Sequence, residues 1–224
     1  MLYKKVSDSA PYKLIILDMD GTLLDGRTIY ALAAELDFEE HLRKIITSNL
    51  QEFEKTIEIA KLLRGLSVAH FLEIFDRIPL RAGIEKVIVA AKKAGMMTVI
   101  ATDSYQLAAN RLAERLGIDR AFANELEVRG KEITGKIKLN NDILEPRVAG
   151  CKIHSVCKRD ILHKLCDELK ITPAEIVAVG DSSNDKCMIK TAGLGITFES
   201  STEINEFADI ILNDDLSKML DYIL

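Results

Sequence analysis

The sequence predicts an α/β fold in which helices cover a parallel β-sheet, with a helical segment inserted after the first strand. Three observations support this prediction. Short apolar runs alternate with longer segments whose apolar residues recur at helical spacing. Residues 28–78 carry helical patterns only. Acidic motifs directly follow two of the apolar runs, at the position where open parallel sheets bind their ligands.

The predicted strands are short apolar runs bounded by turn-forming residues. They cover residues 14–17, 97–101 and 176–179, with a weaker run at 208–212. Amphipathic helices are predicted at residues 84–94, 106–116, 158–169 and 184–192. Two strand-like runs within 125–137 flank Arg129-Gly130-Lys131 and predict a β-hairpin. Gly193-Leu194-Gly195 follows a helix and is interpreted as a turn.

The insertion after the first strand has four predicted helices. They cover residues 29–36, 41–48, 53–63 and 68–75, and polar or glycine-containing breaks separate them. We therefore expect two domains. Residues 1–26 and 79–224 would form the core, and residues 27–78 would form a small helical domain.

Composition and charge limit the possible partners. The 224 residues are 48% hydrophobic and 29% charged, which suits a globular protein. The formal net charge is −5 and basic residues are interspersed with acidic ones, so we expect no nucleic-acid partner. No apolar stretch approaches the roughly 20 residues of a membrane span, and the first residues lack the apolar core of a signal peptide. We expect a cytoplasmic protein without a membrane partner, and no feature predicts its oligomeric state.

The first acidic motif, Asp18-Met19-Asp20-Gly21-Thr22, directly follows the first predicted strand. In an extended segment, residues i and i+2 point to the same side, so both carboxylates can face one reacting phosphorus atom. Asp18 can then attack the phosphorus, and Asp20 can protonate the leaving oxygen. The alternative is a turn that closes the strand, because aspartate and glycine are common turn residues.

A second acidic loop, Gly180-Asp181-Ser182-Ser183-Asn184-Asp185, follows the strand 176–179 and leads into a helix. Together with Asp18 and Asp20, its two aspartates would place four carboxylates around an anionic phosphate. Like charges 4 Å apart repel by about 4 kcal/mol near a protein surface, so a divalent cation is needed. Carboxylate ligands with room for water and phosphate oxygens favour Mg²⁺.

Two further segments can bind the phosphate. The strand 97–101 leads into Thr102-Asp103-Ser104, where a hydroxyl and the free amides of a helix start can meet phosphate oxygens. The same residues are also common helix caps. Lys158 opens the helix 158–169 and is placed to balance the charge of a transferring phosphoryl group, with Lys152 as the competing cation.

In this order the motifs resemble those of the haloacid dehalogenase superfamily, and within it the phosphoserine phosphatase group. The motif 18–22 is similar to the family's first motif, Thr102 to its second, Lys158 to its third and the loop 180–185 to its fourth. The segment 121–128, followed by Ile133-Thr134-Gly135, also resembles phosphoserine phosphatases.

The resemblance implies a Rossmann-like core with a helical cap, and a Mg²⁺-dependent phosphatase that forms a phospho-aspartyl intermediate. Asp18 would be the nucleophile and Asp20 the general acid and base. Substrate and phosphate would be bound by Thr102, Asp103, Ser104, Lys158, Gly21 and Arg27. The metal would be held by Asp18, the backbone carbonyl of Asp20, Asp181 and Asp185, with support from Asn184 and Gly180.

Departures from phosphoserine phosphatases concern the substrate. These enzymes typically carry an Asn-Glu-Thr-Ile stretch whose glutamate meets the substrate's ammonium group, whereas this chain reads Gly26-Arg27-Thr28-Ile29. Ile59 stands where a cap arginine would meet the serine carboxylate. Asp103 stands where the family usually has glycine. We expect a small phosphorylated metabolite as substrate, with phosphoserine as one candidate.

The four cysteines are expected to be free thiols in a reducing compartment. The segment from Cys151 to Lys158 resembles the approach to the third motif in phosphocholine/phosphoethanolamine phosphatases and methionine-salvage enolase-phosphatases, whose substrates are alternative candidates. A Zn²⁺ site formed by Cys151, His154 and Cys157 is possible, although it lacks a clear fourth ligand. The simpler interpretation is a thiol-lined loop beside the active site.

Two functions of another kind compete with the phosphatase. A phospho-accepting signalling domain also uses an aspartate, Mg²⁺ and a parallel sheet, but it needs neither a cap nor a second aspartate. A catalytically idle regulatory or scaffold protein is the other alternative, because a fold does not determine a function.

Overall fold

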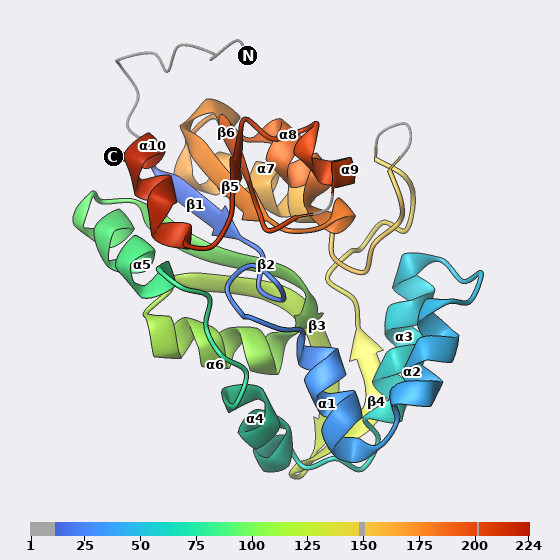
Figure 1. Cartoon of the computed structure of the whole chain (residues 1–224). Coiled ribbons are helices and arrows are strands. Elements are labelled where there is room, and N and C mark those ends of the chain that lie inside the picture. Colours follow the sequence, from blue (N-terminus) through green and yellow to red (C-terminus); the bar gives the residue numbers. More distant parts are fainter. Residues whose placement is uncertain (1–11, 148–150, 201) are drawn as a thin grey trace.

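The computed structural model describes residues 12–147, 151–200 and 202–224. Its centre is a seven-stranded sheet with the strand order β4-β3-β2-β1-β5-β6-β7 (Figure 1). The edge strand β4 runs antiparallel to its neighbour β3. All other neighbouring strands in the sheet pair in parallel. The predicted α/β fold with a mostly parallel sheet is confirmed.

The predicted strands correspond to strands of the sheet. The strands are β1 (Leu14–Leu17), β2 (Met97–Tyr105), β3 (Arg120–Arg129), β4 (Glu132–Lys138), β5 (Ile176–Gly180), β6 (Leu194–Phe198) and β7 (Ile210–Leu212). The predicted hairpin is the turn from β3 to β4. The interpretation of Gly193-Leu194-Gly195 as a turn is wrong, because Leu194 begins β6, which is buried between β5 and β7. Position 195 needs a glycine, because the Cβ atom of any other residue would lie 2.6 Å from the carbonyl oxygen of Ile189.

The predicted helices are also present, with ends that differ by a few residues. The insertion contains α1 (Thr28–Leu36), α2 (Glu39–Ile46), α3 (Glu52–Leu62) and α4 (Val68–Asp76). The remaining α-helices of the described residues are α5 (Ile84–Lys93), α6 (Gln106–Leu116), α7 (Lys158–Leu169), α8 (Lys186–Thr191), α9 (Thr202–Asn205) and α10 (Leu220–Ile223).

Helices cover both faces of the sheet, as the side chains of β1 show. Ile15 and Leu17 belong to an apolar cluster that includes residues of α5 and α6. Leu14 and Ile16 point to the other face, into a cluster that includes residues of α7 and α8. Burial on both faces explains why β1 has an uninterrupted apolar sequence.

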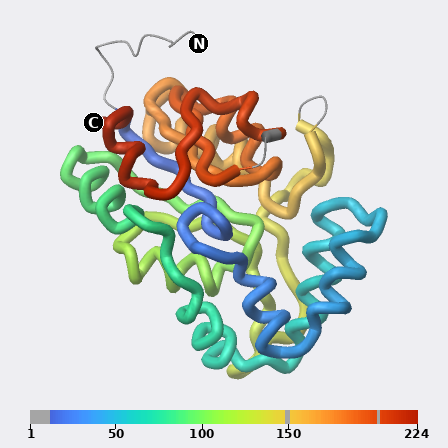
Figure 2. The backbone as a smooth tube through the Cα atoms, viewed as in Figure 1, coloured from blue at the N-terminus to red at the C-terminus, as the bar shows by residue number. Residues whose placement is uncertain are grey.

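The inserted segment leaves the core after β1 and returns before α5 (Figure 2). The β3–β4 hairpin fastens the inserted segment to the sheet, because the backbone between α3 and α4 forms hydrogen bonds with this hairpin. Gly65 N donates to Ile133 O at 2.8 Å, and Val68 N donates to Lys131 O at 2.9 Å. Helices α1 to α4 fall within the predicted domain 27–78, whose boundaries stay a prediction.

The helices of the described residues are all too short or too polar to cross a lipid bilayer. The expectation that the chain starts without a signal-peptide core concerns mainly residues 1–11, which lie outside the described residues.

Candidate active site

The candidate site lies where three adjacent strands of the sheet end. Asp18 directly follows β1, Asp181 directly follows β5, and Thr102 lies in the second half of β2. Because β1 is the first strand and lies between β2 and β5, this is the point from which the strand order proceeds in both directions. Open α/β sheets bind their ligands at such a point.

Lys158 joins the two acidic loops. As the first residue of α7, it places its Nζ 2.5 Å from Asp18 Oδ1 and 2.6 Å from Asp185 Oδ1. All three side chains are buried. Although burial lowers it, the carboxylates of Asp18 and Asp185 raise the pKa of Lys158 overall, so its ammonium group stays charged. The competing cation, Lys152, is exposed and pairs with Glu52 of α3 at 3.5 Å.

Asp18 is a carboxylate in an environment that resists charge. Burial raises the pKa of Asp18 to about 7, the ammonium group of Lys158 opposes this shift, and the charge of Asp181 adds to it. A cation bound beside Asp18 would therefore favour the ionised form that a nucleophile needs.

Three of the aspartates form a candidate metal centre. Asp18, Asp181 and Asp185 each offer an oxygen, and these atoms lie within 4.8 Å of one another. Asp181 Oδ1 is buried and has no hydrogen-bond partner among the described residues. Hard carboxylate oxygens with a free buried acceptor suit a cation such as Mg²⁺. The carboxylate of Asp20 does not belong to this group.

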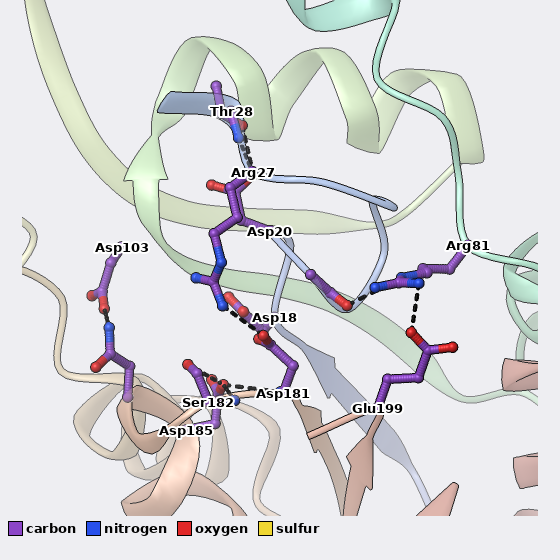
Figure 3. A network of polar contacts seen from close by, with 12 residues as sticks. Asp18, Asp20, Arg27, Thr28, Arg81, Asp103, Asp181, Ser182, Asp185 and Glu199 are labelled. Carbon is purple, nitrogen blue, oxygen red and sulfur yellow. Dashed lines mark hydrogen bonds and ion pairs between the residues drawn. The ribbon is translucent and has the colours of Figure 1, made fainter. Parts of the chain in front are cut away.

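Asp20 is held by Thr28, the first residue of α1. Its Oδ1 accepts hydrogen bonds from Thr28 N at 2.8 Å and from Thr28 Oγ1 at 2.6 Å (Figure 3). Burial raises the pKa of Asp20, and the two bonds from Thr28 oppose this shift. Thr28 was not among the predicted site residues, although a threonine directly before the predicted helix 29–36 and close after Asp20 was a usable signal.

Glycines bring the two acidic loops together. Gly21 has a φ of +91°, and a Cβ atom there would lie 2.5 Å from Asp181 Oδ2. A Cβ atom at Gly180 would lie 2.3 Å from Asp185 Cγ. Neither contact is possible, so both positions need glycine for the carboxylates to approach.

A cavity of about 240 Å³ opens onto these groups. It is lined by Asp18, Asp20, Thr102, Asp103, Ser104, Lys158 and Asn184, and by Arg27, Ile29, Tyr30, Ile46, Thr56 and Ile59 of the insertion. Of the predicted phosphate and substrate residues, Arg27, Thr102, Asp103, Ser104 and Lys158 line this cavity, whereas Gly21 does not.

Two side chains that were expected to bind the substrate, Arg27 and Asp103, instead pair with residues of the loop 180–185. Arg27 Nη2 lies 2.6 Å from Asp181 Oδ2, and Asn184 Nδ2 donates to Asp103 Oδ2 at 2.8 Å. Figure 3 shows Arg27 extended toward Asp181. The guanidinium charge of Arg27 is thus directed at the candidate metal centre.

The cysteine-containing segment lines a neighbouring cavity of about 160 Å³, which also reaches Lys158 and Asn184. Within the described ranges, the acidic group is the one set of three or more potential ligands close enough to share an ion, so Cys151, His154 and Cys157 do not form the zinc site that the sequence allowed. Cys151 instead contacts Cys187 of α8, with 3.4 Å between the sulfur atoms. Burial, together with Cys187, raises the pKa of Cys151 to about 11.

Known proteins of similar sequence can be aligned with most of this chain. A phosphoserine phosphatase of Archaeoglobus fulgidus is 33% identical over 201 residues, which are 88% of this chain and 55% of that protein. A phosphoserine phosphatase of Methanocaldococcus jannaschii is 32% identical over 216 residues, which are 94% of this chain and 97% of that protein. The chain thus spans about half the length of the first relative and nearly all of the second.

Solved structures and a family model agree with these relatives. A phospho-aspartyl intermediate analogue of a phosphoserine phosphatase superposes with a TM-score of 0.80 at 32% identity, over 96% of this chain and 100% of that chain. A substrate-bound phosphoserine phosphatase complex has the same TM-score at 31% identity and the same coverage. Residues 12–193 match the model of the haloacid dehalogenase-like hydrolases. The chain belongs to the haloacid dehalogenase-like hydrolase family.

Proposed function

We propose that the protein is a Mg²⁺-dependent phosphomonoesterase that hydrolyses a small phosphorylated metabolite through a phospho-aspartyl intermediate and is phosphoserine phosphatase-like. The enzyme class, phosphoric monoester hydrolase, follows from the family match together with relatives that are phosphoserine phosphatases. The observation that carries the mechanism is the buried contact of Asp18 with Lys158, next to Asp20 and on the wall of one cavity.

In the first step, an oxygen of Asp18 attacks the phosphorus atom and the bond from phosphorus to the leaving oxygen breaks. Asp20 gives its proton to the leaving oxygen, for which its raised pKa is suited. In the second step, water attacks the phosphorus atom, Asp20 takes the proton of that water, and the bond to Asp18 breaks. Lys158 and Thr102, which line the cavity, bind the phosphoryl oxygens.

The aspartates at 18, 181 and 185 would hold Mg²⁺, with the backbone carbonyl of Asp20 as a further ligand. The ion would neutralise charge on the phosphoryl group and on these carboxylates. Asn184 and Gly180 would support the loop 180–185, which carries Asp181 and Asp185. Arg27, which pairs with Asp181 at 2.6 Å and lines the cavity, would add a positive charge to the side chains that bind the phosphoryl group.

The cavity lies between residues of the core and of the insertion, which supports a cap function. We propose that residues 27–78 form a cap domain that excludes bulk water during the reaction, over a core formed by residues 1–26 and 79–224. Thr28 would link cap and chemistry, because it holds Asp20 from the first residue of α1. We place this activity in the cytoplasm.

Phosphoserine is the first substrate candidate because the relatives with similar sequence are phosphoserine phosphatases. The resemblance to other phosphatases of the family gives a second candidate, a small phosphomonoester without a carboxylate: phosphocholine, phosphoethanolamine or a methionine-salvage intermediate. Of the cap residues that line the cavity, all of them within the described part, Arg27 is the one charged residue, and Ile59 stands among two other isoleucines. The isoleucines suit an uncharged part of a leaving group, whereas Arg27 would repel the cationic group of phosphocholine, phosphoethanolamine or phosphoserine unless its charge stays paired with Asp181.

Phosphate release from a panel of phosphorylated metabolites tests this function. We expect Mg²⁺-dependent release from p-nitrophenyl phosphate and faster release from one small phosphomonoester of the panel. A preference for phosphoserine over phosphoethanolamine would favour the first candidate, and the reverse order would favour the second. A protein that becomes phosphorylated once without turnover would instead be a phospho-accepting signalling domain, and one that does neither would be an idle member of the family.

A further inference from the structure

Two cysteines distant in the sequence meet next to the candidate active site. Cys151 precedes α7, Cys187 lies in α8, and their sulfur atoms are 3.4 Å apart. Both thiols are free and half-buried, and both line the cavity of about 160 Å³ that reaches Lys158. The pair is therefore in contact and open to a small molecule.

We propose that Cys151 and Cys187 are a modification site at which a hydroperoxide forms a reversible disulfide. One thiol attacks the outer peroxide oxygen, so that its sulfur becomes a sulfenic acid and the rest of the peroxide leaves as an alcohol or water. The second thiol attacks this sulfur, the S–S bond forms, and water leaves. The two thiols together lose two electrons and two protons, and the hydroperoxide takes them up.

The contact geometry favours this pair over the other thiols. The sulfur atoms, 3.4 Å apart, need to approach by about 1.4 Å to reach the bond length of about 2.05 Å. Cys157 lines the same cavity, but no contact joins it to another sulfur atom among the described residues. Cys166 is buried in the apolar cluster beneath α7. The disulfide should therefore form selectively.

The segment 151–157, which carries Cys151, also contacts the N-terminal end of α3. Ile153 O accepts a hydrogen bond from Phe53 N at 3.2 Å, and Lys152 pairs with Glu52 at 3.5 Å. Figure 1 shows this segment leading from β4 toward α7 beside α3. A bond from Cys151 to Cys187 would fix the segment, and with it these contacts to the insertion, against α8.

Two functional groups are adjacent to the cross-link. Cys187 follows the acidic loop that ends at Asp185, and the segment of Cys151 leads directly into Lys158. The disulfide would hold both ends of the Asp185–Lys158 contact and would restrain the cap in its present position. This regulatory part of the inference rests on the proposed function, because it assumes that the cap opens to exchange substrate and product.

Prolonged treatment of the purified full chain with hydrogen peroxide tests the inference, since a protonated thiol reacts slowly. After the remaining thiols are alkylated, peptide mass spectrometry should find Cys151 joined to Cys187, and the free thiols should fall from the four cysteines of the chain to two. Release of p-nitrophenol from p-nitrophenyl phosphate should fall on the order of tenfold, because restrained opening limits turnover. Dithiothreitol should restore both the thiols and the activity.

Serine variants separate the possible outcomes. C151S and C187S should keep their activity after peroxide, whereas C157S, a matched control from the same cavity, should still form the cross-link and lose activity. A cross-link to Cys157, or none, would overturn the modification site. Equal losses of activity in wild type and C187S would overturn the regulatory role. A cross-link in a protein without phosphatase activity would contradict the proposed function but leave the modification site standing.

Discussion

Lys158 contacts Asp18 and Asp185 in a place where all three side chains are buried. A buried charge that loses its partner is costly, whereas an exposed ion pair contributes little. The contacts of Lys158 thus support the fold as well as the chemistry. They also distinguish it from Lys152, the competing cation, which pairs at the surface.

Replacing Lys158 with methionine should lower the free energy of unfolding by about 3–5 kcal/mol, because two buried carboxylates lose their common cation. K152M, the matched control, should cost about 1 kcal/mol or less. The deficit of K158M should shrink as the pH is lowered, since protonation of Asp18 removes an unpaired charge. Denaturant unfolding at several pH values measures these differences, and equal effects of the two substitutions would contradict the assignment.

Burial raises the pKa of Asp20, and the hydroxyl group of Thr28, which donates at 2.6 Å, opposes this shift. A hydrogen bond to a carboxylate favours the charged form, so T28V should raise the pKa of Asp20. The alkaline limb of the pH profile of kcat/KM, which requires protonated Asp20, should move to higher pH by on the order of one unit. T22V removes a buried hydroxyl that has no partner among the described residues and should leave the profile in place. An unshifted profile in T28V would show that Thr28 does not act through Asp20.

At the scale of elements, the loops after β1 and β5 create the site. Both were predictable because the chemistry is local: each motif directly follows a short apolar strand. The Arg27–Asp181 pair was not predictable as a contact, because it depends on where the start of α1 lies relative to the loop after β5. β6 was missed because its two-glycine start, 193–195, resembles a turn and its burial comes from neighbouring strands and α8.

Gly21 gives an element-scale prediction, since its Cβ position is occupied by the carboxylate of Asp181. G21A should weaken Mg²⁺ binding on the order of tenfold or more, because displacement of one ligand by about 1 Å disturbs the site. G65A is the matched control: Gly65 has a similar φ of +85°, but nothing lies within 4 Å of its Cβ position. Isothermal titration with Mg²⁺ should show the loss in G21A alone, and similar affinities in both variants would contradict this account.

At the scale of the whole molecule, a sheet with helices on both faces carries a helical insertion that the β3–β4 hairpin fastens. The alternation of strands and helices predicted this architecture, and the strandless stretch predicted the insertion. The contact that anchors the insertion could not be predicted from the sequence, since it consists of backbone hydrogen bonds between the loop after α3 and the β3–β4 hairpin.

Metal binding should stabilise the whole fold, because the carboxylates of the candidate metal centre repel one another without an ion. Mg²⁺ at about 100 times its dissociation constant should add about 2.7 kcal/mol to the free energy of unfolding, and chelation by EDTA should remove this gain. Thermal unfolding at constant ionic strength measures the effect. An equal rise in D181N would contradict the metal assignment.

The central claim is that Asp18 carries the phosphoryl group, and an acid-quenched reaction with p-nitrophenyl phosphate in Mg²⁺ tests it most directly. Mass spectrometry of the peptides should locate a phosphate on Asp18, and hydroxylamine should remove it, as expected for an acyl phosphate. D18N should remain folded, carry no phosphate and show no turnover. Phosphate on another residue, or turnover by D18N, would contradict the account.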